Sequence, residues 1–124
     1  MTGLLRILVG AIALFNIAIG LMFLANPAGA AVGFFLTPVG SQGLATLRAD
    51  FPGFFITGGV FALIGAVRGH GQPLQVPLLL LAIALAGRCV SLALDGVAAT
   101  AYPPMLAEAI MIATLLLART RFNR

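Results

Sequence analysis

Four long apolar runs dominate this chain and constrain its fold more than any other feature. They cover about residues 4–25, 44–67, 76–94 and 101–118. A helix needs about 20 mostly apolar residues to cross about 30 Å of hydrocarbon. The first run exceeds the apolar region of about 7–15 residues in a cleaved signal peptide, which favours its retention as a helix over cleavage. The pattern therefore predicts an all-α integral membrane bundle of four transmembrane helices, with residues 1–124 forming a single domain.

Charged residues are scarce along the whole chain. They make up only 8% of the residues, whereas soluble proteins are about a quarter charged. A water-soluble fold is thereby excluded, and a lipid bilayer is the expected surrounding. The seven basic residues are scattered singly and form no basic face, so nucleic acid is not expected as a partner.

The residue types that usually carry catalysis or hold metals are also few. His70 is the only histidine and Cys89 the only cysteine, so we expect no zinc site and no disulfide within the chain. The sequence contains no nucleophile elbow, phosphate-binding loop or dinucleotide fingerprint. We therefore expect no metal and no cofactor, and an enzyme is the least favoured functional class.

Five arginines fall on one side of the predicted membrane topology. The connections on the other side, about residues 26–43 and 96–101, contain no lysine or arginine. Since short loops rich in positive charge stay in the cytoplasm, both termini are expected there, in a multi-pass protein of the bacterial inner membrane. The partly apolar connection 26–43 is expected to lie along the membrane surface. The five arginines are Arg6, Arg68, Arg119, Arg121 and Arg124.

The remaining charges lie in the outer half of three predicted helices. At helical rise, most of them come to about 6–9 Å below the outer ends of the helices. An unpaired charge at the centre of a spanning helix costs about 2.5–3.5 kcal/mol, and less toward the ends. Because pairing inside the bundle is cheaper than exposure to lipid, we expect a buried polar cluster. Its candidate members are Arg48, Asp50, Arg88, Ser91, Asp95 and Glu108.

Helical spacing distributes these candidates over different faces. Arg88, Ser91 and Asp95 follow an i, i+3, i+7 pattern and share one face. Arg48 lies about 200° around the helix from Asp50, so it points elsewhere, and the headgroup boundary is a second place for it. The two arginines and three acids leave one negative charge, so one acid is protonated, faces water or is matched by a cationic ligand.

Two further residues affect the surroundings of this cluster. Pro52 should kink the second helix or mark its first turn, and the backbone groups that it frees then need partners within the protein. Asn16, near the middle of the first helix, is a candidate hydrogen-bonding neighbour.

Two strings of residues carry a resemblance to a known family. They are RADFPG at residues 48–53, followed by a glycine-rich apolar helix, and GRCVSLALDG at residues 87–96. The chain resembles a bacterial family of short four-helix integral membrane proteins described only as a domain of unknown function. The pair Pro52-Gly53 stands where that family usually has two glycines. The resemblance implies a four-helix membrane fold and carries over no activity. The matching positions are Arg48, Phe51, Gly53, Gly87, Arg88, Ser91, Asp95 and Gly96.

Three functions fit this pattern of residues. In the first, the polar cluster is a structural ion-pair network, and the protein is a structural or accessory membrane subunit. In the second, the arginines bind a lipid headgroup, a quinone or another small anion, and the carboxylates orient them. In the third, the chain works as an oligomeric carrier, with Asp50 or Glu108 as the protonatable group. The expected partners are the lipid bilayer, a lipid or quinone ligand, and a second copy or another membrane protein.

Overall fold

The computed structural model describes residues 2–123, and most of them are helical. Four helices are long and apolar enough to cross a membrane, which confirms the all-α fold and the four apolar spans predicted from the sequence. Arg124, one of the five arginines used to predict orientation, lies outside the described residues. The elements are α1 (Thr2–Ala25), α2 (Pro27–Val32), α3 (Gly40–Arg68), the short 3-10 helix η1 (Gln72–Leu74), α4 (Gln75–Asp95), the 3-10 helix η2 (Ala99–Ala101) and α5 (Tyr102–Arg121).

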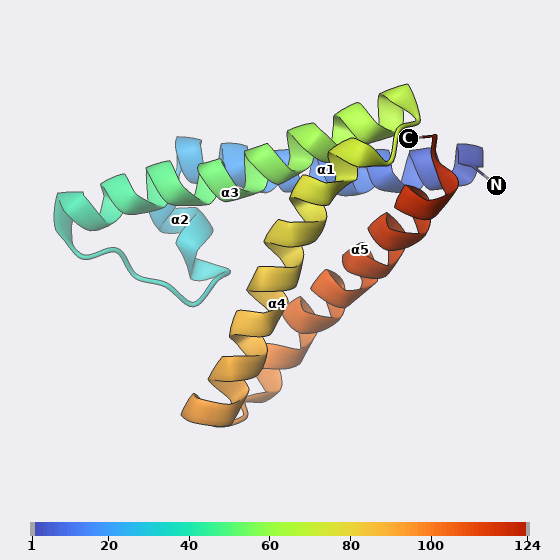
Figure 1. Ribbon diagram of the computed structural model, residues 1–124. Helices are drawn as coiled ribbons and strands as arrows, with labels where there is room; N and C mark the ends of the chain where they lie inside the picture. The colour runs from blue at the N-terminus through green and yellow to red at the C-terminus, as the bar shows by residue number, and fades with distance from the viewer. Residues whose placement is uncertain (1, 124) are drawn as a thin grey trace.

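The long helices form two antiparallel pairs. Helix α3 runs back alongside α1, and α5 runs back alongside α4 (Figure 1). The two pairs meet at the end of the molecule that holds both termini and the turn between α3 and α4, and they diverge toward the opposite end (Figure 1). The helices therefore enclose a common interior at one end only. We call this the closed end and the opposite one the open end.

The hydrophobic core follows the same division. The core of the closed end draws on all four long helices, whereas the core of the open end comes from α1, α2 and α3 and the connection after α2. At the open end, α2 and the rings of Phe23 and Phe34 occupy the side of α1 and α3 to which α4 and α5 would otherwise pack. The closed-end core consists of Leu5, Val9, Ala13, Ala62, Ala66, Leu74, Leu78, Leu81, Leu115, Ala118 and Phe122.

Two glycines allow the backbones of α1 and α3 to approach closely. A Cβ atom at Gly59 would lie 2.7 Å from the carbonyl oxygen of Ala13, and one at Gly20 would lie 2.4 Å from Cγ1 of Ile56. Both separations are shorter than real Cβ contacts. Small residues at such crossings are typical of membrane helices, where association relies on close packing rather than on the hydrophobic effect.

An arginine of α1 binds the C-terminal end of α3, and an arginine of α3 binds the C-terminal end of α1. Arg6 of α1 donates from Nε to the carbonyl oxygen of Ala66 at 2.7 Å, and from a terminal nitrogen to that of Val67. Arg48 of α3 donates from Nε to the carbonyl oxygen of Leu24 at 3.1 Å. The last carbonyls of a helix lack partners within the helix and carry partial negative charge. Each helix therefore supplies a cation to the C-terminal end of the other.

The connection between the first two spans has structure of its own. Asn26 accepts a hydrogen bond from the backbone N–H of Gly29 at 3.2 Å and starts α2, with Pro27 in the first turn. Helix α2 folds back against α1 and α3. Helix α3 then begins at Gly40, earlier than the predicted start near residue 44, so Pro52 lies inside the helix rather than in its first turn.

The other helix ends match the sequence signals. Gly69 terminates α3 in the left-handed region, with φ of 67°. Asp95 ends α4 and Gly96 follows with φ of 92°, as the Asp-Gly pair predicts. The C-terminal segment is tied to the α3–α4 turn by two backbone bonds between Asn123 and Gly69 or Gly71. The four spans therefore leave both termini at the same end of the molecule (Figure 1).

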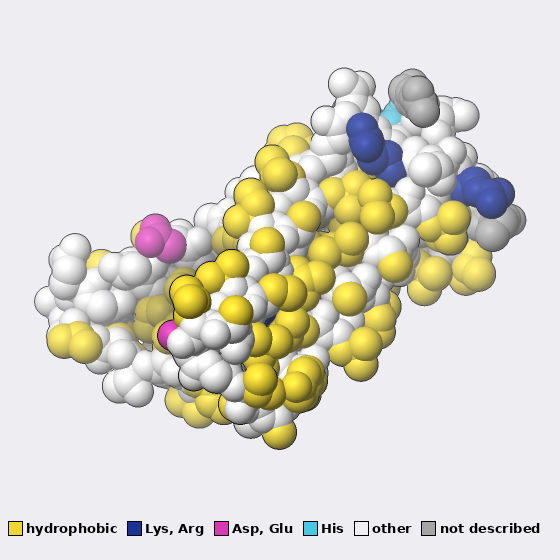
Figure 2. Space-filling model, turned by 60° about the horizontal axis from the view of Figure 1, so that its bottom comes forward, with side chains coloured by type: hydrophobic (Ala, Val, Ile, Leu, Met, Phe, Trp, Pro, Cys, Tyr) yellow, Lys and Arg dark blue, Asp and Glu magenta, His cyan; other side chains and the backbone are white. Residues whose placement is uncertain are grey.

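Apolar side chains cover much of the outer surface, and charges gather at its two ends. In Figure 2, arginines lie toward one end and acidic side chains toward the other, with apolar side chains between them. Large residues such as Ile7, Leu79 and Ile83 are more than half exposed. Soluble monomers rarely expose contiguous apolar patches of this kind, whereas such a surface suits a surrounding of lipid.

The close contact of α1 and α3 predicts a sharp difference between two glycines of the same helix. Gly59→Ala should lower the free energy of unfolding by about 1–3 kcal/mol, because its methyl group meets the backbone of Ala13. The check is unfolding in detergent micelles, followed by circular dichroism. Gly53→Ala is the matched control, since nothing lies within 4 Å of its added Cβ. Equal changes in the two variants would contradict the close approach.

Candidate functional site

An ion pair joins α4 to α5. Nε of Arg88 donates to Oε1 of Glu108 at 2.9 Å. The Glu108 side chain is 11% exposed and that of Arg88 is 38% exposed, so the carboxylate is the enclosed partner and the guanidinium reaches outward. Hydrogen bonds between ionised groups are stronger than neutral ones. The sequence predicted both residues for the polar cluster, and the structure brings these two together.

A cleft opens beside this ion pair, between α3 and the α4–α5 hairpin. Its cavity has a volume of about 290 Å³. Phenylalanine rings form most of its wall, and Asp50 of α3 is its third charged residue. The lining residues are Phe34, Asp50, Phe51, Phe54, Phe55, Ala84, Arg88 and Glu108.

A second cavity of about 390 Å³ adjoins the first. Arg88 and Phe34 line both cavities, so the guanidinium stands at their junction. The second cavity lies between the connection after α2 and the start of α5. Its other lining residues are Gly33, Phe35, Thr100, Pro103 and Pro104. We refer to the two cavities together as the lateral cleft.

Stacked aromatic rings hold the α3 wall of the lateral cleft in place. The rings of Phe23 and Phe51 stack with centroids 4.6 Å apart, and Phe34 packs edge-on against Phe23 at 5.2 Å. Phe54 and Phe55 meet edge to face at 4.9 Å. Such pairs contribute about 0.5–1.5 kcal/mol beyond the apolar area that they bury. The wall is therefore an ordered apolar surface with Asp50 at its side.

The other predicted cluster residues lie outside the lateral cleft. Ser91 donates to a carboxylate oxygen of Asp95 at 2.8 Å, and both are exposed on α4. Arg48 is engaged with the carbonyl oxygen of Leu24. The six residues therefore form no single network: Arg88 and Glu108 are bonded, Asp50 lines the same cavity, Ser91 and Asp95 bond to each other within α4, and Arg48 bonds to the end of α1. The expectation that Arg48 points away from Asp50 agrees with this geometry.

Helical spacing in the sequence already puts Phe54 on the face of the helix that holds Asp50, but the part that Phe34, Phe51 and Phe55 play in the cleft wall was not predicted. Phe51, Phe54 and Phe55 follow helical spacing beside Asp50, and that spacing is the signal that they share a face. Phe34 carries no such signal because it lies in a connection. Asn16 is buried and donates to the carbonyl oxygen of Ile12 and to Sδ of Met111 at 3.7 Å. It therefore links α1 to α5 rather than to the ion pair.

A double-mutant cycle tests the ion pair. Arg88→Met and Glu108→Gln should each destabilise the protein, with a coupling energy of about 1.5–3 kcal/mol, because the hydrogen bond joins two ionised groups. The measurement is the free energy of unfolding of both single variants and the double variant in detergent micelles. Arg88→Met with Asp95→Asn is the matched control, and its coupling should stay within about 0.5 kcal/mol. Equal coupling in both cycles would contradict the assigned pair.

Within residues 2–123, no three side chains of His, Cys, Asp and Glu are grouped so that they could hold a metal ion. No family model, curated protein or solved structure matches the chain. The likeness of residues 48–53 and 87–96 to the bacterial four-helix family therefore stays a prediction.

Proposed function

We propose that the chain is a small accessory protein of the membrane that binds an amphipathic lipid in the lateral cleft, with the headgroup between Arg88 and Asp50. The observation that carries this proposal is the position of Arg88. It is bonded to Glu108 through Nε, and it lines both cavities of the cleft. Among the described residues, its two terminal nitrogens have no protein acceptor. They are free to donate to a ligand.

The charges of the lateral cleft favour a headgroup that carries both signs. One guanidinium and two carboxylates line the first cavity, so these groups sum to one negative charge. A phosphate group matches the free nitrogens of Arg88, and a primary ammonium group matches the carboxylate of Asp50. A zwitterionic phospholipid with a primary amine supplies both. A quinone supplies no cation for Asp50, and an anion without an amine would add to the negative charge.

The walls of the cleft suit the remainder of such a lipid. Phe51, Phe54 and Phe55 offer an apolar surface along α3, and an acyl chain gains from contact with it. Cavities of about 300–1,000 Å³ lined mostly by apolar side chains with a few polar groups are typical of small-molecule sites. The divergence of the two hairpins (Figure 1) supports entry of the lipid from the side, within one leaflet.

The distribution of arginines supports one membrane orientation. Arg6, Arg68, Arg119 and Arg121 lie on the helix ends and turns of the closed end, and positively charged ends stay in the cytoplasm. We therefore propose that both termini face the cytoplasm of a bacterial cell and that the lateral cleft opens to the outer leaflet of its inner membrane. Membership of the bacterial four-helix family is part of the same proposal, supported by the strings at 48–53 and 87–96.

A purely structural role is the second candidate, because the ion pair itself joins α4 to α5. It accounts less well for Asp50, which has no bonded partner among the described residues yet lines the same cavity. The Arg88–Glu108 pair joins α4 only to α5. Among the described residues, no hydrogen bond or ion pair beside the lateral cleft joins α3 to the α4–α5 hairpin. A network that served only to fix the bundle would bridge that gap.

Lipid retention in native mass spectrometry tests the proposal. The wild-type protein, in micelles supplied with equal amounts of phosphatidylethanolamine and phosphatidylcholine, should retain the first in preference, because only its ammonium group donates hydrogen bonds to Asp50. Arg88→Gln should reduce the retained phosphatidylethanolamine about tenfold, through the lost charge-assisted bond to phosphate. Asp50→Asn should abolish the preference between the two lipids. Circular dichroism checks that each variant is folded.

Arg48→Gln is the matched control for this experiment. Arg48 lies on α3, two residues before Asp50, but it does not line the cavity. Its removal takes away an arginine and should leave lipid retention unchanged. A wild-type protein that retains neither lipid would contradict the proposal. So would equal losses in the Arg48 and Arg88 variants. An Arg88→Gln protein that is less stable yet retains as much lipid as the wild type would favour the structural role.

A further inference from the structure

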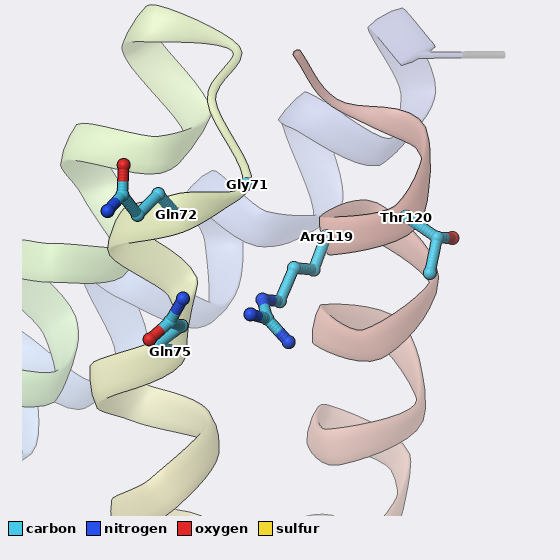
Figure 3. Close-up of a pocket in the computed structure, with 5 residues that line it drawn as sticks. All are labelled: Gly71, Gln72, Gln75, Arg119 and Thr120. Carbon is cyan, nitrogen blue, oxygen red and sulfur yellow. The ribbon is translucent and has the colours of Figure 1, made fainter. Parts of the chain in front are cut away.

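The closed end holds a polar pocket that is separate from the lateral cleft. Its volume is about 430 Å³, and it lies between the start of α4 and the end of α5 (Figure 3). The residues that line it are Gly71, Gln72, Gln75, Arg119 and Thr120. None of them lines the lateral cleft, so the pocket is independent of the function proposed above.

Arg119 supplies the charge of this pocket. Figure 3 shows its guanidinium extending from α5 into the space between the helices, toward the amide of Gln75, while the side chain of Thr120 points away. Among the described residues Arg119 has no hydrogen-bond or ion-pair partner. Its guanidinium has five N–H donors, and the NH2 group of Gln75 adds two more, whereas the amide of Gln72 points away from Arg119 (Figure 3). The N–H groups of Arg119 are therefore available to bind an acceptor in this pocket.

The two walls of the pocket are held together by backbone contacts. The N–H of Gly71 donates to the carbonyl oxygen of Asn123 at 2.8 Å, and the N–H of Asn123 donates to that of Gly69 at 3.0 Å. A Cβ at Gly71 would lie 2.6 Å from the carbonyl oxygen of Arg119, so only glycine fits there. The backbone of α5 at Arg119 therefore lies at a fixed place beside the start of α4.

Charge at this end of the molecule selects the ligand. Arg6, Arg68, Arg119 and Arg121 lie here, whereas the three acids lie on stretches of α3, α4 and α5 away from this end. Arg6 is engaged by the end of α3. No carboxylate among the described residues competes for Arg119. The site therefore attracts an anion, and a planar guanidinium binds phosphate well because its N–H groups match the phosphate oxygens.

We propose that this pocket binds a phosphate group, supplied by the headgroup of an anionic phospholipid or by free phosphate, with Arg119 as the main donor and Gln75 as a second donor. The pocket lies at the ends of the apolar segments of α4 and α5, which is the level of the headgroups when these helices span a bilayer. Basic pockets between helices on the cytoplasmic side bind lipid headgroups in the same manner.

The test uses the whole protein in nanodiscs of phosphatidylcholine, to which either phosphatidylglycerol or inorganic phosphate is added. Bound phosphate groups are followed by native mass spectrometry after release from the discs. Arg119→Gln should weaken binding about tenfold or more, because a charge-assisted bond is lost. Gln75→Leu keeps every arginine and should weaken binding about threefold, through the loss of a neutral donor. The second variant keeps the test valid should the first fail to fold.

Arg68→Gln is the matched control, since it removes the same charge from the same end but lies outside this pocket. Retention of phosphatidylglycerol that depends on Arg119 identifies the lipid as the source, whereas Arg119-dependent binding of inorganic phosphate alone identifies the free anion. Equal losses in the Arg68 and Arg119 variants would show that only the general positive charge acts, and would overturn the site. Absence of binding by either probe would also overturn it. Arg88 and Asp50 are intact in all these variants. A negative result for the phosphate pocket therefore does not count against lipid binding in the lateral cleft.

Discussion

The contact between α1 and α3 is the interaction on which the remainder of the structure depends. Gly59 and Gly20 bring the two backbones together, and Arg6 and Arg48 bind the last carbonyls at opposite ends of the pair. In lipid, apolar side chains gain little from contact with one another compared with acyl chains. Close packing and the pairing of helix ends must therefore supply the specificity. At the closed end, α4 and α5 pack against this hairpin.

The connection between α1 and α3 contributes residues to the core of the open end. Helix α2 and Phe34 complete a core with α1 and α3 at the open end, and α4 and α5 diverge from this core (Figure 1). Arg88 of α4 and Glu108 of α5 pair with each other beside the cavity. Asp50 is left on the opposite wall. An ion pair with unused donors, a lone carboxylate and phenylalanine rings surround one cavity, and this is the surface that we propose binds an amphipathic lipid.

The sequence predicted the spans, several of their ends and a common level for Arg88 and Glu108, because these depend on the length of apolar runs and on depth along the helices, but it did not single out these two residues as a pair. Helical spacing placed Arg88, Ser91 and Asp95 on one face of α4, and Ser91 and Asp95 do bond to each other there. Depth along the helices did not reveal that Arg88 bonds to Glu108 while Asp95 does not. Arg48 has a backbone carbonyl as its partner, and counting charged side chains against one another does not reveal such acceptors. The divergence of the hairpins was also beyond prediction, because it depends on the packing of α2 and Phe34 in a connection without periodic pattern.

Helices α3 and α4 touch where Leu80 meets Gly58 and separate at the lateral cleft. Electron–electron distance measurements between spin labels in lipid nanodiscs test this arrangement directly. One label pair uses the native, exposed Cys89 with Gly53→Cys, and the other uses Thr57→Cys with Leu79→Cys in a Cys89→Ala background. The structure predicts a clearly longer distance for the first pair, because Leu80 packs against Gly58 at 3.2 Å from its Cβ position, whereas a cavity lies between Phe54 and Arg88. Equal, short distances for both pairs would show a closed four-helix bundle and contradict the account.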